Sequence, residues 1–119
     1  MGRVRLGLGA LLALVAVTAN ATAPAAAQPR PLASGTRLGE VRLYPAEMTS
    51  AVLFLFSGRQ GWSQAEARTA ERLARGGTSV IGVDLAAYLA AIEGPARDCL
   101  YVVGDIEDTS KRVHRELGS

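Results

Sequence analysis

The middle of the chain alternates between continuous apolar runs and a helical pattern. Residues 51–56 are all apolar, and residues 78–83 are again β-branched and apolar. Runs of this length predict strands buried on both faces, as in a parallel sheet. Between them, Ser63 and Glu66 form a capping-box pattern, small or apolar residues follow at helical spacing, and Gly76-Gly77 ends the helix. This part therefore predicts a strand, a helix and a strand.

Two shorter patterns flank this unit. Val41 and Leu43 alternate with polar residues and predict a short strand that ends at Pro45. Residues 85–92 predict one or two helical turns after the second apolar run. The last pattern begins at Pro95, which suits the first turn of a helix.

The final helix is expected to run to about Leu117, with Gly118 as its cap. One face of this helix carries apolar or small residues at i, i+3, i+4 and i+7 spacing. They are Cys99, Val102, Val103, Ile106, Ser110, Val113 and Leu117.

The element order is strand, strand, helix, strand, helix (β-β-α-β-α), which is typical of an α/β fold with a parallel sheet. The last helix returns the chain to no further strand. We therefore expect the front part of a larger fold, with an exposed sheet edge and an uncovered helix face. Such a piece is expected to be marginally stable or prone to aggregation.

The N-terminal 27 residues predict a secretory signal peptide. Arg3 and Arg5 precede an uncharged apolar stretch over residues 6–19, and small residues follow. That stretch is shorter than the ~20 residues of a transmembrane helix. Cleavage after Ala21 or after Ala27 fits the small-x-small pattern of signal-peptide cleavage sites. An uncleaved N-terminal anchor is the alternative. We expect a periplasmic protein, with a linker over residues 28–39 and one domain over residues 40–119.

Charge and cysteine content exclude several classes of protein. The chain has 13 Lys and Arg against 11 Asp and Glu, and two of the arginines lie in the signal segment. The remaining chain is neutral and gives no electrostatic reason to expect nucleic acid. Cys99 is the single cysteine, so no internal disulfide can form. Stability must therefore come from an ordinary core.

The loop after the first apolar run is the strongest candidate for chemistry. It comprises Ser57, Gly58, Arg59, Gln60, Gly61 and Trp62. Ligands of open α/β sheets bind at the carboxyl ends of strands, where free backbone N–H groups hold an anion or an oxyanion. A tight turn that needs glycine, with Trp62 over the core, is the alternative. Asp84 ends the second apolar run at the same sheet edge, where it contacts a ligand or caps the next helix.

The other reactive side chains give weak signals. We expect Cys99 to be a small buried hydrophobe and His114 to be a solvated or half-buried helix residue. With one histidine and one cysteine, we expect no metal site. The sequence contains no nucleophile elbow and no phosphate-binding loop, and we expect no cofactor.

Several short motifs together resemble the AcvB/VirJ family of bacterial virulence proteins. They are Leu-Phe-Ser-Gly at 55–58 with Gly61-Trp62, Gly-Val-Asp-Leu at 82–85 with Tyr88-Leu89, and Asp-Cys-Leu-Tyr at 98–101 with Asp105-Ile106-Glu107. The resemblance covers roughly residues 41–118. It implies an exported protein with the α/β-hydrolase fold, from a family implicated in lysyl-phosphatidylglycerol hydrolysis and in type IV secretion-linked virulence.

The chain departs from the family pattern in two ways. Arg59 stands where the C-terminal copy of two-domain members has an acidic residue. The serine elbow follows the next strand in the family, and the acid and histidine come later still, so His114 cannot be the catalytic histidine. The resemblance implies the N-terminal part of such a domain, inactive alone. A noncatalytic periplasmic binding or scaffold module that supports a catalytic partner domain or a secretion system is the alternative. The partners expected are a catalytic partner domain, a lipid-derived substrate or type IV secretion components.

Overall fold

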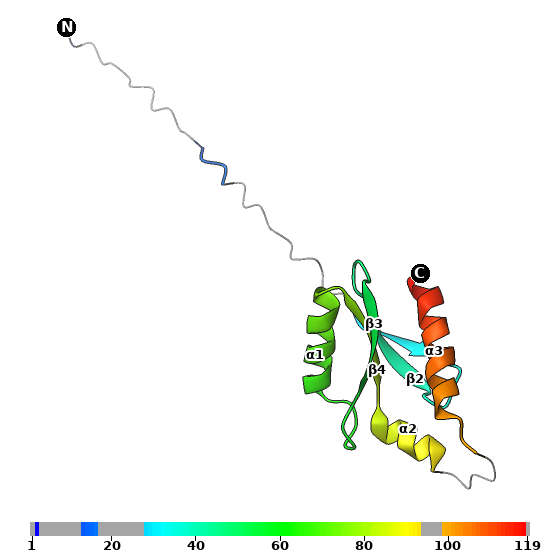
Figure 1. The fold of residues 1–119 in the computed structure, drawn as a ribbon. Helices are drawn as coiled ribbons and strands as arrows, with labels where there is room; N and C mark the ends of the chain where they lie inside the picture. Colours follow the sequence, from blue (N-terminus) through cyan, green and yellow to red (C-terminus); the bar gives the residue numbers. More distant parts are fainter. Residues whose placement is uncertain (1, 3–12, 17–27, 94–98, 119) are drawn as a thin grey trace.

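In a computed structural model, the chain forms a four-stranded mixed sheet with three helices (Figure 1). The structure describes residues 2, 13–16, 28–93 and 99–118. The elements are β1 (Arg30–Ala33), β2 (Glu40–Tyr44), β3 (Ala51–Phe56), α1 (Gln64–Arg75), β4 (Thr78–Val83), α2 (Leu85–Ile92) and α3 (Val102–Leu117). The α/β class is confirmed. The signal peptide lies almost entirely outside the described residues and stays a prediction.

The strand order is β1-β2-β4-β3. Only β3 and β4 are parallel, with Phe54 beside Ile81, whereas β2 is antiparallel to both β1 and β4. The prediction of a parallel sheet is therefore wrong for β1 and β2. The short link from β2 to β3 contains no helix that could carry the chain across the sheet in a parallel crossover.

Strand β1 lies within residues 28–39, which the sequence predicted as a linker. Arg30–Ala33 pairs with Glu40–Leu43 in an antiparallel hairpin, and Gly35 and Gly39 adopt positive φ in the connecting turn. Pro31 hides this strand from sequence inspection. A proline is tolerated here because β1 is an edge strand, where one backbone N–H faces away from the sheet.

The two predicted apolar strands differ in burial. β4 is buried along nearly its whole length, as expected, because it lies between β2 and β3. β3 lies at the sheet edge and is only half-buried, which corrects the expectation that both of its faces are covered. Its continuous apolar pattern therefore belongs to a strand at the edge of the described sheet.

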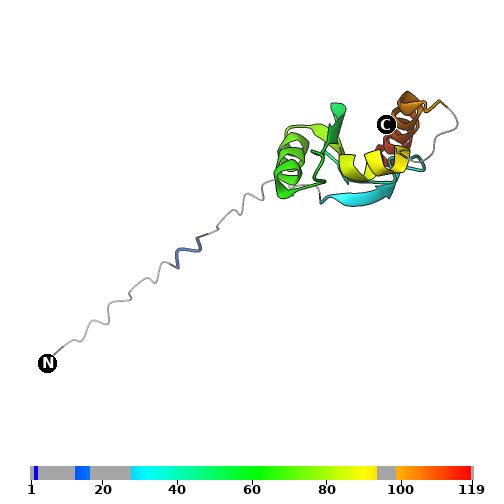
Figure 2. The ribbon, with the colours of Figure 1, turned by 90° about the horizontal axis from the view of Figure 1, so that it is seen from below.

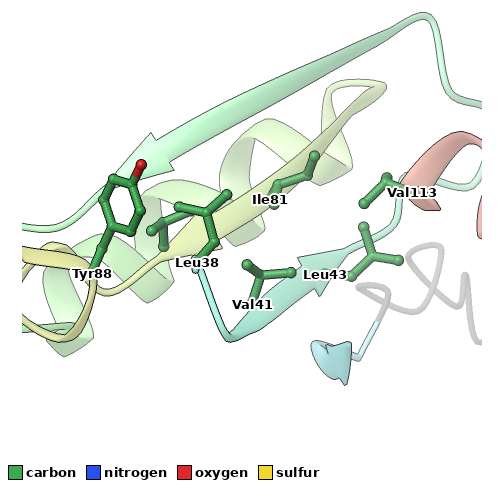
Figure 3. Packing of buried hydrophobic residues seen from close by; sticks show 7 residues of the cluster. Leu38, Val41, Leu43, Ile81, Tyr88 and Val113 are labelled. Carbon is green, nitrogen blue, oxygen red and sulfur yellow. The ribbon is translucent and has the colours of Figure 1, made fainter. Parts of the chain in front are cut away.

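Helices cover both faces of the sheet (Figures 1 and 2). Helix α1 packs Ala70 and Ala74 against Tyr44 and Val80 on one face. Helices α2 and α3 cover the other face through Tyr88 and Val113. The core there also contains Leu38, Val41, Leu43, Ile81 and Val83 (Figure 3).

Helix α3 begins at Val102, later than the sequence predicted, and Pro95 lies outside the described residues. Cys99 precedes the helix and is exposed, so its predicted burial on the helix face is wrong. The buried residues of α3 are Asp105, Thr109 and Val113. Two of these are polar and hydrogen-bonded, which a search for apolar periodicity cannot detect. None of the described helices has the length and apolar content needed to cross a bilayer.

Candidate functional site

The Ser57–Trp62 loop and Asp84 meet at the carboxyl ends of the parallel pair. Phe56 at the end of β3 pairs with Val83 at the end of β4, so the residues that follow both strands lie at one edge of the sheet. The loop leads directly into α1, and Asp84 leads directly into α2. The sequence predicted this juxtaposition from the strand ends, and the structure shows it.

Ser57 fixes the start of the loop. Its side chain is buried, and its N–H continues the ladder by donating to the carbonyl of Val83 (2.9 Å). The Ser57 Oγ accepts from the N–H of Leu85 (2.9 Å) and donates to the carbonyl of Gly58 (3.0 Å). The hydroxyl therefore ties the two strand ends together, and its donor is used within the loop.

Asp84 caps α2 and also holds the loop. One carboxylate oxygen accepts from the N–H of Ala87 (3.0 Å), and the other faces the N–H of Trp62 (3.4 Å). The hydrogen bond from Ala87 is the main cause that lowers the pKa of Asp84, with smaller contributions from the amides of Trp62 and Ala86 and the charge of Arg42. The capping alternative for this residue is what the structure shows.

A second carboxylate caps α1. Glu66 accepts from the N–H of Ser63 (3.0 Å) and from its hydroxyl, completing the predicted capping box. The pKa of Glu66 is lowered, first by the hydroxyl of Ser63, with a smaller contribution from the amide of Gly58. The carboxylates of Glu66 and Asp84 thus accept hydrogen bonds from backbone N–H groups at the N-termini of α1 and α2. An external anion would otherwise bind at these N-termini.

Trp62 packs against the sheet and anchors the end of the loop. Its indole lies over Gly82, where a Cβ would approach the ring to 2.5 Å. The ring centroid is 6.1 Å from that of Tyr44, and the Arg42 guanidinium lies 5.3 Å from the indole centroid, within the range of a cation–π contact. The expected role of Trp62 as a cover over the core agrees with these contacts.

Arg59 and Gln60 form the exposed tip of the loop. Gly61 adopts φ +94°, and a Cβ there would lie 3.3 Å from the Asp84 carboxylate. The N–H of Gly61 donates to the carbonyl of Gly58 (3.1 Å), whereas the N–H groups of Arg59 and Gln60 have no hydrogen-bond partner among the described residues. These two amides and the Arg59 guanidinium are what the loop can offer to an anionic ligand.

His114 and Cys99 make no contact with this loop among the interactions of the described residues. His114 lies near the C-terminal end of α3, which is at the opposite end of the sheet from the loop (Figure 1). Cys99 is an exposed free thiol. In the part of the chain that the structure describes, no three His, Cys, Asp or Glu side chains come together as a metal site would require.

The structure also contains a buried charged cluster that the sequence analysis missed. The Asp105 carboxylate accepts from Arg37 Nε (2.9 Å) and from the hydroxyl of Tyr88 (3.1 Å). The Arg37 guanidinium also reaches the carbonyl of Tyr101 (3.4 Å). This cluster joins the β1–β2 connection to α2 and α3, and 68 residues separate Arg37 from Asp105. No local pattern in the sequence signals a pair so far apart.

Comparison with known proteins finds no counterpart: no family model, no curated protein and no solved structure matches this chain.

Proposed function

We propose that this chain supplies the oxyanion-loop side of an exported AcvB/VirJ-type α/β-hydrolase-like domain and has no hydrolytic activity alone. One observation carries the proposal. In α/β-hydrolases the loop between the third strand and the first helix contributes an oxyanion-hole N–H. Here the Ser57–Trp62 loop lies between β3 and α1, the third strand and the first helix, at the carboxyl end of the parallel pair.

The absence of a nucleophile elbow from the sequence supports the inactive part of the proposal. Acyl transfer needs a hydroxyl or thiol next to a base. The Ser57 hydroxyl is engaged with the backbone of Gly58 and Leu85, and the buried Ser79 hydroxyl is engaged with Ala46 and Thr49. A catalytic partner domain would have to bring the nucleophile to the Arg59 and Gln60 amides.

The test is an assay of lysine release from vesicles that contain lysyl-phosphatidylglycerol. We expect the purified chain to release no lysine above a protein-free blank. Release that is abolished by Ser57→Ala or Ser79→Ala, with an unchanged circular dichroism spectrum, would overturn the proposal. Recovery of the protein from the periplasm with Thr22 or Gln28 at its N-terminus would support export, whereas an intact N-terminus would contradict cleavage.

A noncatalytic scaffold is the second candidate. The commitment of Asp84 and Glu66 to the helix N-termini favours it, because both carboxylates hold the loop together and repel an incoming anion. This candidate predicts that cross-linking in the bacterial envelope captures a catalytic domain or a secretion component through this chain. Arg59→Ala keeps the backbone N–H of residue 59, so neither candidate expects this variant to change the cross-link.

A further inference from the structure

We propose that helix α2 controls how firmly the Ser57–Trp62 loop is held, and that Ser57 and Asp84 are the positioning residues through which it does so. Two crossed contacts join the loop to the helix. Ser57 begins the loop, and its Oγ accepts from the N–H of Leu85, the first residue of α2 (2.9 Å). Asp84 precedes α2, and its carboxylate accepts from the N–H of Trp62, the last residue of the loop (3.4 Å). Each end of the loop is therefore held by the junction between β4 and α2.

The Asp84 carboxylate holds the loop and the helix at the same time. One of its oxygens accepts from Trp62, and the other accepts from the N–H of Ala87 in the first turn of α2 (3.0 Å). The carboxylate also lies close to Gly61, where a Cβ would approach it to 3.3 Å. A movement of α2 that carries Asp84 with it therefore changes the contacts of the loop. The exposed tip at residues 59–60 lies between the two held ends, so its position depends on them.

The buried charged cluster holds the same helix from another side. Tyr88 lies one helical turn after Asp84, and its hydroxyl donates to the Asp105 carboxylate (3.1 Å), which also accepts from Arg37 Nε (2.9 Å). Among the described residues, neither Asp105 nor Arg37 bonds to a residue of the loop. A series of hydrogen bonds thus runs from the β1–β2 connection and α3, through α2, to the loop. Contiguous networks of this kind carry energetic coupling between separated parts of a protein.

This arrangement makes the loop respond to contacts made at a distance from it. A partner that alters the cluster changes the seating of α2, and with it the position of the Arg59 and Gln60 N–H groups. The coupling is reciprocal, so a ligand held by those amides would strengthen the contact between Tyr88 and Asp105. The consequence for hydrolysis rests on the proposed oxyanion role of the loop. The coupling itself does not rest on it, and it is therefore measured without a substrate.

Amide hydrogen exchange of the purified chain, followed residue by residue by NMR, tests the coupling. The N–H groups of Trp62 and Leu85 report the two contacts between the loop and α2, and the amides of the central strand β4 report the stability of the whole domain. Tyr88→Phe removes a hydroxyl that does not touch the loop. We expect this variant to lower the protection of Trp62 and Leu85 at least about twofold beyond any change in β4.

Thr109→Val is the matched control for that variant. Thr109 is buried on α3, and its hydroxyl is hydrogen-bonded to the hydroxyl of Thr36 (3.2 Å). This control therefore also removes a buried hydroxyl, but from a contact that does not include α2. Relative to β4, the protection of Trp62 and Leu85 should stay at the parent value. Unchanged protection of these two amides in Tyr88→Phe, or an equal loss in Thr109→Val, would overturn the proposal.

Ser57→Ala tests the coupling in the opposite direction. The N–H of Ala87 is held by Asp84 and not by Ser57, so it reports whether loss of one positioning residue weakens the contacts of the other. We expect its protection to fall at least about twofold relative to β4. Ser63→Ala, which removes the cap of α1 at the other end of the loop, should leave Ala87 unchanged. A Ser57→Ala variant that affects Leu85 and leaves Ala87 as in the parent chain would show two independent contacts and overturn the proposal. Neither result depends on lysine release, so the coupling and the proposed function can fail separately.

Discussion

The contact between Gly82 and Trp62 depends on the absence of one methyl group. Gly82 lies on β4, and a Cβ there would approach the indole to 2.5 Å. Overpacking of this kind costs about 1–3 kcal/mol. Gly82→Ala is therefore expected to lower the free energy of unfolding by about 2 kcal/mol and to displace the ring. Denaturant unfolding followed by the fluorescence of Trp62, the single tryptophan, measures both effects.

Gly58→Ala is the matched control in the same part of the molecule. A Cβ at Gly58 would meet no atom within 4 Å, and its φ is not positive. We expect this variant to unfold at the parent denaturant concentration with an unchanged emission spectrum. Equal destabilisation by the two alanines would mean that general loop strain, and not the tryptophan contact, explains the effect.

Asp105 is the residue on which the buried charged cluster depends. Its replacement by asparagine removes the carboxylate that accepts from Arg37 and Tyr88 and leaves the arginine without its counter-charge. Hydrogen bonds to charged groups contribute about 1.5–3 kcal/mol, so we expect Asp105→Asn to lower the free energy of unfolding by about 2 kcal/mol. Thermal and denaturant unfolding measure this loss.

Asp108→Asn is the control for that experiment. Asp108 and Lys111 are both largely exposed and lie 3.9 Å apart, and such surface pairs contribute little. The expected change is below about 0.5 kcal/mol. A loss as large as that of Asp105→Asn would contradict a special role for the buried cluster. The sequence could not predict the cluster, because aspartate at position 105 looks like any polar residue of an amphipathic helix.

Helix α2 depends on its N-cap. Asp84→Ala removes the acceptor for Ala87 and the contact to Trp62, and loss of an N-cap costs about 1 kcal/mol. Asp84→Asn keeps a hydrogen-bond acceptor at the N-cap and should therefore lower the stability less than Asp84→Ala. Because the pKa of Asp84 is lowered from its ordinary value of 3.8, its contribution is complete above pH 3.8 and is lost as the pH falls through the lower folded value.

Acid unfolding separates the charge of Asp84 from its hydrogen bonds. The difference in stability between the parent chain and Asp84→Asn should be constant from pH 5 to 7 and should shrink as the pH falls below 3.8. Equilibrium unfolding at fixed pH values measures it. A difference that does not change with pH would show that the carboxylate charge contributes nothing to the cap.

Individual elements differ in how well the sequence predicts them. The capping box at Ser63 and the apolar run of β4 are local signals, and both predicted elements are present. The sequence did not predict β1, because Pro31 and its neighbours are typical of a linker. Only pairing with β2 makes this segment a strand. The helix was expected from Pro95 because proline suits a first turn, whereas α3 begins at Val102. The apolar pattern also left out Asp105 and Thr109, which are buried in the structure.

The arrangement of the whole sheet is the least predictable level. The lengths and compositions of the strands do not determine that β2 is antiparallel to β4, because hydrogen bonds between strands distant in sequence fix this orientation. The candidate site is more predictable, since the carboxyl ends of two parallel strands necessarily meet at one edge. What the sequence could not show is that Asp84 and Glu66 already occupy the donors of that edge.

At the scale of the molecule, α2 and α3 are joined through the hydroxyl of Tyr88. Burial raises the pKa of Tyr88 first, and the Asp105 carboxylate raises it further, against a smaller opposite effect of Arg37. The protonated tyrosine is therefore favoured in the folded state. Its contribution is complete below the unfolded value of about 10 and is lost as the pH rises through the higher folded value.

Tyr88→Phe should therefore remove part of the alkaline loss of stability. Below pH 9 the variant is expected to be less stable than the parent chain, because Asp105 loses one donor. Above pH 10 the parent chain should lose stability faster, so that the difference between the two narrows. Tyr101→Phe, at a 65% exposed position, is the control and should follow the parent curve. Parallel curves for the parent chain and Tyr88→Phe between pH 9 and 11.5 would show that the tyrosine titrates alike in both states, and that its hydrogen bond does not join the helices.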